Sequence, residues 1–128
     1  MRLWHYSLIP ILDNQRLLGQ HRECCALRGK GWGKPHATVN YVFTHDYSML
    51  FRYHYLVMNE MINRGYKVNP LWYSPRYRGQ LIGLDTSDFT EVKSLLMYPE
   101  HNDDYLQKCI ENIEKKKQTK ERKKNEIN

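Results

Sequence analysis

Apolar residues recur at helical spacing in three segments of this chain, and glycine or proline separates each segment from the next. Helices are predicted from Asp13 or Asn14 to about Arg28, from Asp46 or Ser48 to Arg64, and from Asn102 or Asp103 to Glu114. Gly29 and Gly65 suit the ends of the first two helices, because glycine readily adopts the conformations that stop a helix. The 128 residues have room for one core. We therefore expect a mainly α protein, a single compact domain of three main helices with long irregular loops.

The segments between the helices are expected to be irregular. Residues 29–35 read Gly-Lys-Gly-Trp-Gly-Lys-Pro, and this density of glycine excludes a regular helix or strand. Residues 71–79 form an aromatic and basic loop. The run His36–Phe43 is β-branched and aromatic, and we expect it to be extended or helical, because a lone strand has nothing to pair with.

The first helix is expected to bury one face. With side chains about 100° apart around the axis, that face carries Leu17, Leu18, His21, Cys24 and Cys25. The opposite side carries Arg16, Gly19, Gln20 and Glu23, with Arg22 flanking it.

Positive charge is unevenly distributed along the chain, whose net charge is +6. Residues 1–80 carry eleven Lys or Arg and four acidic residues. Residues 81–114 carry two Lys and eight acidic residues, and residues 115–128 carry seven Lys or Arg and two Glu. We therefore divide the chain into a helical domain, residues 1–114, and a basic C-terminal tail, residues 115–128, which is either a helical extension or disordered. A basic, aromatic first half is typical of proteins that bind a polyanion, although ordinary surface lysines would give the same composition.

Other features of the sequence favour a cytoplasmic protein. No window is long and apolar enough to span a membrane, and the first twelve residues lack the apolar run and cleavage site of a signal peptide. The three cysteines are an odd number without repeated spacing, which favours reduced thiols over disulfides. We expect a monomer without a membrane partner.

Glu23 is the strongest catalytic candidate from the sequence, because it is the only acid between Asp13 and Asp46 and three arginines lie within about two turns of it. Such a carboxylate stays ionised and can orient a nucleophile, stabilise a cation or move protons. The alternative is an ordinary surface ion pair between Glu23 and a nearby arginine, which is the commoner case for such a residue.

No metal site is predicted. His21, Cys24 and Cys25 lie one turn apart, but structural zinc usually has four ligands and no second Cys/His pair follows at suitable spacing. The other histidines are scattered, and His54 is expected to be a satisfied core histidine.

Residues 15–23, Gln-Arg-Leu-Leu-Gly-Gln-His-Arg-Glu, resemble the first helix of the phage-type endonuclease V proteins, Gln-His-Leu-Met-Ala-Glu-Tyr-Arg-Glu, at the same distance from the start. Residues 60–66, Glu-Met-Ile-Asn-Arg-Gly-Tyr, resemble that family's Glu-Cys-Leu-Lys-Arg-Gly-Phe, and Arg78-Gly79 after an aromatic residue resembles Phe-Arg-Gly. The chain thus resembles the pyrimidine-dimer DNA glycosylases over about residues 1–80, and the Gly-Trp-Gly-Lys loop resembles a bacterial branch. The family's aromatic C-terminal tail is replaced by lysines.

The resemblance implies a DNA repair glycosylase with abasic-site lyase activity on damaged duplex DNA, pyrimidine dimers in particular. In that family the N-terminal segment threads between helices and the terminal α-amine attacks the sugar C1′, giving an imine that undergoes β-elimination without a metal or other cofactor. Glu23 would support these steps, and the residues expected to contact DNA are Gln15, Arg16, Arg22, Arg64 and Arg78. A base is taken out of the stack in the complex.

One departure from the family lies at the N-terminus. The family nucleophile is a small residue exposed by removal of the initiator methionine, whereas position 2 here is Arg2. Either the amine of Met1 serves, or processing exposes that of Arg2, or catalysis is lost. The alternatives are therefore a non-catalytic nucleic-acid-binding module of the same fold and, more distantly, a metal-dependent nuclease that uses the histidines.

Overall fold

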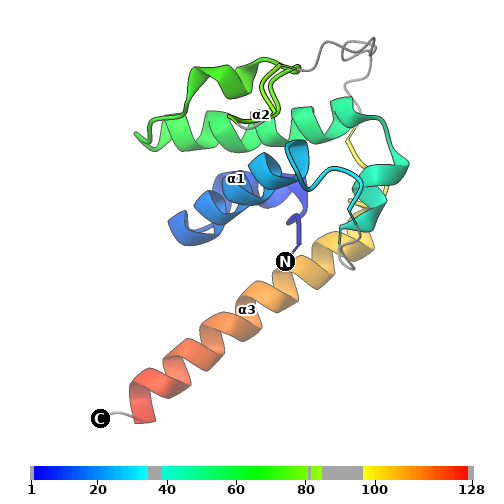
Figure 1. Ribbon diagram of the computed structural model, residues 1–128. Coiled ribbons are helices and arrows are strands. Elements are labelled where there is room, and N and C mark those ends of the chain that lie inside the picture. Colours follow the sequence, from blue (N-terminus) through cyan, green and yellow to red (C-terminus); the bar gives the residue numbers. More distant parts are fainter. Residues whose placement is uncertain (1, 35–38, 81, 85–96, 127–128) are drawn as a thin grey trace.

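The computed structural model describes residues 2–34, 39–80, 82–84 and 97–126, with side chains as far as Lys117 (Figure 1). Its α-helices are α1 (Asn14–Arg28), α2 (Tyr47–Asn63) and α3 (Asp103–Glu126), and its 3-10 helices are η1 (Tyr6–Ile11), η2 (Asn40–Thr44) and η3 (Pro70–Tyr73). In the described part of the chain, the only β pairing is an isolated antiparallel bridge between Tyr77 and Leu84. The expected mainly α domain with three main helices is confirmed.

The ends of α1 and α2 lie where the sequence predicts them. Asp13 precedes α1, and the Gly29 N–H ends it by donating to the carbonyls of Cys25 and Ala26 at 3.1 and 3.2 Å. The Asp46 carboxylate accepts from the Ser48 N–H at 2.9 Å and caps α2, which is the usual role of aspartate before a helix. Gly65 follows α2 with a φ of +92°, a conformation that favours glycine.

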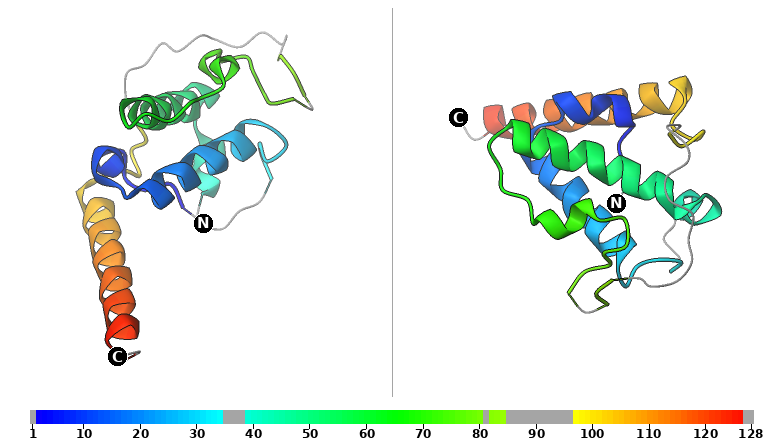
Figure 2. Two further views of the ribbon diagram at one scale, coloured as in Figure 1. Left: turned by 90° about the vertical axis from the view of Figure 1, so that its left-hand side faces the viewer. Right: turned by 90° about the horizontal axis from the view of Figure 1, so that it is seen from above.

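Helix α3 begins at Asp103 as expected but does not stop at residue 114. The Asn102 side chain accepts from the Tyr105 N–H at 2.9 Å, and Asp103 and Asp104 stand in the first turn, where the helix dipole favours acids. The helix then continues through the basic tail to Glu126. Of the two alternatives for the tail, the structure shows the helical extension, which projects away from α1 and α2 (Figures 1 and 2).

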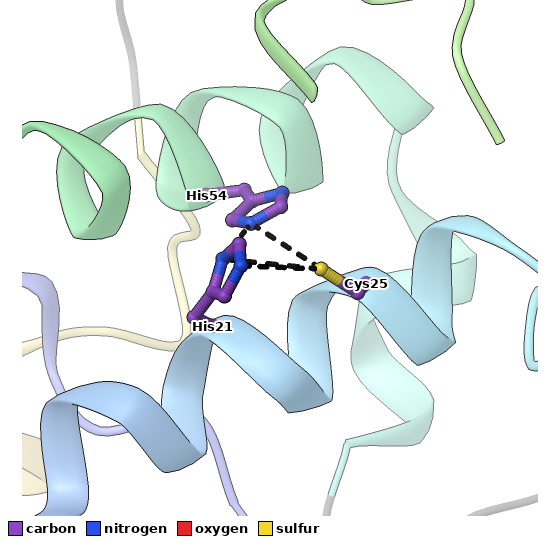
Figure 3. Close-up of side chains that lie close together, drawn as sticks. All are labelled: His21, Cys25 and His54. Carbon is purple, nitrogen blue, oxygen red and sulfur yellow. Dashed lines mark hydrogen bonds between the residues drawn. The ribbon is translucent and has the colours of Figure 1, made fainter. Parts of the chain in front are cut away.

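The core lies where α1 packs against α2 and where η1 and the first turns of α3 cover that pair. Its fully buried apolar side chains include Leu3, Leu17, Val39, Val42, Leu50, Val57 and Cys109. On one flank of the α1–α2 contact, His21 and Cys25 of α1 meet His54 of α2 (Figure 3). In the described part of the chain, no helix is long and apolar enough to cross a bilayer.

The buried face of α1 is rotated from the one that the sequence predicts. Leu17 and Cys24 are buried as expected, but Leu18 is only partly buried. Gln20 and Arg28 are buried instead, at 2% and 0% exposure. The prediction for Gln20 was wrong because the periodicity argument treats a polar residue as outward-facing, whereas both of these side chains find buried hydrogen-bond partners.

From Asn40 onward the run His36–Phe43 is helical and forms part of η2, and Val39 before it is in a turn. Residues 35–38 lie outside the described residues. The loop after α2 contains η3, in which the Asn69 side chain accepts from the Leu71 N–H at 3.1 Å.

Candidate active site and nucleic-acid interface

The side chain of Gln20 holds the N-terminal segment in place. Gln20 Nε2 donates to the Arg2 carbonyl at 2.9 Å, and the Trp4 N–H donates to Gln20 Oε1 at 3.0 Å. The Tyr53 hydroxyl of α2 lies 2.7 Å from both Gln20 Oε1 and the Trp4 carbonyl and donates to them. Since Leu3 and Trp4 are 0% and 5% exposed, the segment passes through the interior and brings the N-terminal end of the chain to α1.

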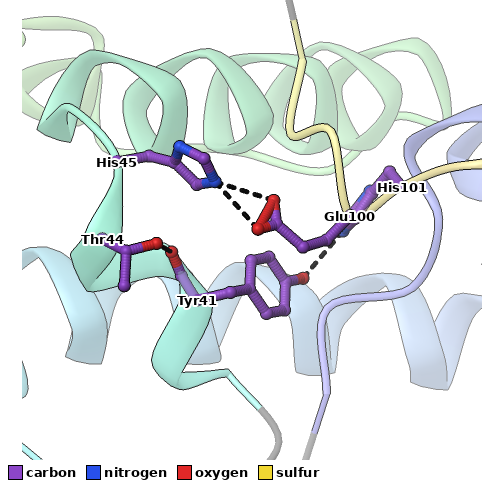
Figure 4. Close-up of polar contacts among 5 residues, drawn as sticks. All are labelled: Tyr41, Thr44, His45, Glu100 and His101. Carbon is purple, nitrogen blue, oxygen red and sulfur yellow. Dashed lines mark hydrogen bonds and ion pairs between the residues drawn. The ribbon is translucent and has the colours of Figure 1, made fainter.

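A second anchor joins the N-terminal segment to the start of α3. The Tyr105 hydroxyl donates to the Leu3 carbonyl at 2.5 Å, and the Tyr6 N–H donates to His101 Nδ1 at 3.2 Å. Because Nδ1 accepts, the His101 ring carries its proton on Nε2, which faces the Tyr41 hydroxyl at 2.8 Å (Figure 4). Burial lowers the pKa of His101 to about 3, with a smaller contribution from His5, so the ring is neutral.

The segments around this anchor are joined by further polar contacts. Thr44 Oγ1 donates to the Tyr41 carbonyl at 2.8 Å, and His45 Nε2 lies 2.7 Å from Glu100 Oε1 (Figure 4). The first contact lies within η2, and the second ties the residue after η2 to the segment just before α3. The N-terminal segment is therefore held on two sides by elements from distant parts of the sequence.

Three cationic side chains surround the Trp4 ring. The guanidinium carbons of Arg2 and Arg16 lie 5.3 and 5.9 Å from its centroid, and the Lys116 ammonium of α3 lies 5.3 Å from it. Such distances suit cation–π attraction. The tryptophan thus gathers positive charge from the N-terminal segment, α1 and the C-terminal part of α3.

A hollow of about 330 Å³ lies beside this cluster and is lined by Asp13, Gln15, Arg16, Arg22 and Lys116. Arg16 is paired with Asp13 at 2.7 Å, which leaves Arg22 and Lys116 to give the hollow a positive character. Guanidinium, ammonium and amide groups are the side chains that bind phosphate oxygens. The structure therefore brings together three of the residues expected to contact DNA, namely Gln15, Arg16 and Arg22.

Glu23 is partly exposed on α1, one residue after Arg22. Among the described residues the ion pairs within 4.0 Å are Asp13–Arg16, His45–Glu100 and Glu60–Arg64, so Glu23 has no ion-pair partner among them. Glu23 belongs to the helix that anchors the N-terminal segment.

The structure sets Arg64 and Arg78 apart from the hollow. Arg64 pairs with Glu60 at 2.9 Å and donates to Asn14 Oδ1 at 3.0 Å and to the Pro10 carbonyl at 3.1 Å, which joins the end of α2 to η1 and α1. The Arg78 guanidinium lies 3.9 Å from the centroid of the Tyr47 ring. Met1, the remaining candidate, lies outside the described residues.

Arg28, whose side chain is fully buried, has a structural role that was not predicted from the sequence. It donates to the carbonyls of Trp72 and Ser74, both at 2.8 Å, and to that of Tyr77 at 3.2 Å. These bonds fasten the loop after α2 onto the end of α1. An arginine near the end of a helix suggests a surface cation, and its position in the sequence gives no sign of these distant carbonyls.

The fold and these sites define a small helical protein with a buried N-terminal segment and a cationic hollow on its first helix. Residues 1–74 match the family model of the pyrimidine dimer DNA glycosylases, which is more than half of the 128 residues. The chain belongs to the pyrimidine dimer DNA glycosylase family, as the resemblance of its motifs indicated. No curated protein and no solved structure matches it. The match covers α1, α2 and η3, and α3 lies beyond it.

Proposed function

We propose that this protein is a DNA repair glycosylase with abasic-site lyase activity, acting on damaged duplex DNA and on pyrimidine dimers in particular. The observation that carries the proposal is the arrangement on α1. Gln20 fixes the N-terminal segment, Arg22 and its neighbours line a cationic hollow, and the Glu23 carboxylate lies next to Arg22 in sequence without an ion-pair partner among the described residues.

The proposed nucleophile is the terminal α-amine, of Met1 or of Arg2 after processing. It attacks the sugar C1′, the bond from C1′ to the base breaks, and the base leaves with a proton, so that an imine forms as the sugar ring opens. Loss of a C2′ proton then drives β-elimination and breaks the C3′–O bond. An α-amine has a reference pKa of about 8, far below that of lysine, and nearby cations favour its neutral, nucleophilic form.

The cations of Arg2, Arg16 and Lys116 supply that environment at the end of the N-terminal segment. We assign Glu23 the role of stabilising the cationic imine and assisting proton transfer, since a carboxylate close to a developing positive charge stabilises it. Neither role requires a metal ion or an organic cofactor.

The partner in this proposal is double-stranded DNA, bound by a monomer in the cytoplasm at the nucleoid. Gln15, Arg16 and Arg22 would contact phosphates, and Lys116 would extend the contact onto α3. Arg64 and Arg78 are assigned a supporting role, because the structure shows both in contacts with other parts of the protein.

The test is strand cleavage of duplexes that contain an abasic site or a pyrimidine dimer, in the presence of a chelator. Wild-type protein should cleave them, and Glu23→Gln should lower the rate by about 10²-fold or more while DNA affinity stays within a few fold. Glu114→Gln, which removes an exposed carboxylate from α3, is the matched control and should cleave normally. Cleavage that needs an added divalent metal, or Glu23→Gln with unchanged turnover, would overturn the proposal.

A second candidate is a nucleic-acid-binding module of the same fold without catalysis. It is favoured by Arg2, whose side chain lies against Trp4 where the family has a small residue. Such a protein would bind duplex DNA with a salt-dependent affinity and leave abasic sites intact.

A further inference from the structure

Helix α1 carries a second cluster of reactive side chains, turned away from Glu23. His21 and Cys25 stand four residues apart on one face of the helix, and His54 of α2 faces them (Figure 3). Glu23 is two positions from each of the α1 residues, which is about 200° around the axis. The cluster is therefore distinct from the site proposed above.

The potential ligand atoms of the cluster lie within 4.8 Å of one another. His21 Nδ1 lies 2.8 Å from His54 Nε2, and Cys25 Sγ lies 3.8 Å from both ring nitrogens of His21 and 3.9 Å from His54 Nε2. A tetrahedral zinc ion with its usual bond lengths separates two nitrogen ligands by about 3.3 Å and a nitrogen from a sulfur by about 3.6 Å. Shifts of about half an ångström or less would bring the three side chains to these separations.

The cluster also has a route to solvent and room for one more ligand. His54 is fully buried, but His21 and Cys25 are partly exposed. Cys25 lines a hollow of about 420 Å³ together with Gly29, Lys30, Trp72 and Arg78. Three protein ligands with an open fourth position are the arrangement of a zinc site that binds water or a substrate, whereas structural zinc usually has four protein ligands.

We propose that His21, Cys25 and His54 bind one divalent ion of the zinc class, with the fourth coordination position open toward the hollow beside Trp72. The donor set supports this class of ion, because thiolate and imidazole are preferred by Zn²⁺ and disfavoured by Mg²⁺ and Ca²⁺. The site was not predicted from the sequence, because His54 is distant in sequence from the other two ligands.

Binding requires the loss of two hydrogen bonds, the one between His21 and His54 and the one between Arg28 and His54. Arg28 Nη1 lies 2.8 Å from His54 Nδ1, and a guanidinium can only donate, so the metal-free His54 ring carries its proton on Nε2. On metal binding this proton moves to Nδ1, Arg28 turns away from the ring, and the Cys25 thiol releases one proton to solvent. The bonds from Arg28 Nη2 to the carbonyls of Ser74 and Tyr77 do not involve the nitrogen that faces His54. These changes cost free energy. The site should therefore bind a metal ion more weakly than a site in which the non-ligating nitrogen of the histidine already donates a hydrogen bond to an acceptor.

The test is a titration of the reduced, metal-stripped protein with Co²⁺, followed by displacement with Zn²⁺. One equivalent of Co²⁺ should give visible d–d bands and a near-ultraviolet thiolate charge-transfer band, and Zn²⁺ should remove both. Cys25→Ala should lose the charge-transfer band and weaken binding by at least about 10-fold to 100-fold. Cys24→Ala is the matched control, because its thiol is adjacent in sequence but fully buried in the core, and it should behave as wild type.

Two further variants keep the test independent of folding. His21→Ala changes a partly exposed side chain, and His54→Gln keeps an acceptor for Arg28. Both should fold, as judged by circular dichroism, and bind Co²⁺ at least about 10-fold more weakly. Absence of stoichiometric binding to the wild type would overturn the proposal, as would a charge-transfer band that persists in Cys25→Ala.

Discussion

The ammonium group of Lys116 on α3 lies 5.3 Å from the centroid of the Trp4 ring in the N-terminal segment. This contact joins the N-terminal segment to the C-terminal helix, and it places the start of the basic tail beside the hollow that Arg22 and Gln15 line. The family match ends at residue 74, so α3 lies outside the matched residues, and its Lys116 contributes to the same cationic surface.

The first prediction concerns this basic tail. Deleting residues 115–128 removes seven Lys or Arg and two Glu. If these side chains bind phosphates, the log–log slope of DNA affinity against salt should become shallower by about 0.9 for each phosphate that the truncated protein no longer neutralises. Cleavage at low salt should remain. Fluorescence anisotropy at several salt concentrations measures the slope, and an unchanged slope would show that the tail does not touch DNA.

The second prediction concerns Gln20. Gln20→Leu leaves the Trp4 N–H and the Arg2 carbonyl without their buried partner, which should lower the free energy of unfolding by about 2–4 kcal/mol. The loosened N-terminal segment should also slow imine formation more than it weakens DNA binding. Urea unfolding and single-turnover cleavage measure the two effects. Gln15→Leu is the control, because Gln15 is exposed and should affect binding without loss of stability.

The third prediction is a pH dependence of stability that arises from His101. Burial lowers the folded-state pKa of this ring from 6.5 to about 3, so the unfolded chain binds the proton more readily than the folded protein. The contribution of His101 to the free energy of unfolding is therefore fully present above pH 6.5. It is lost as the pH drops from 6.5 toward about 3, and the loss is on the order of a few kcal/mol. Urea unfolding between pH 7 and about 4 tests this. His101→Gln should give a flatter profile, and an equally steep one would exclude His101 as a source.

The fourth prediction distinguishes Arg22 from Arg64, which the family resemblance both assigns to DNA binding. Arg22→Ala should weaken DNA binding and reduce the salt slope by about 0.9, with stability unchanged, because Arg22 is exposed. Arg64→Ala should instead lower the free energy of unfolding by about 1–2 kcal/mol and leave the slope alone, because it removes the bonds to Glu60, Asn14 and Pro10. The reverse pattern would show that Arg64 is the residue that binds phosphate.

Local signals in the sequence predicted the helices well and the burial of individual polar residues poorly. The Asp46 cap and the Gly29 stop act on neighbouring backbone groups, so their effects could be inferred from position alone. The burial of Gln20 and Arg28 depends on partners 18 and 46 residues away, such as Arg2 and Ser74, and no periodicity argument contains that information. The contact of His54 with His21, 33 residues apart, was missed for the same reason.

The central claim is that the terminal amine forms an imine with DNA in a site on α1. Sodium borohydride trapping on an abasic-site duplex, in chelator, followed by mass spectrometry of the linked peptide, tests it most directly. The proposal predicts a covalent adduct at the amine of Met1 or of Arg2, and protein with an acetylated N-terminus should give no adduct while still binding DNA through its basic surface. Lysines are disfavoured as nucleophiles, because a pKa of about 10.4 leaves them protonated near neutral pH. No adduct with the wild-type protein, or attachment to an internal lysine, would contradict the claim.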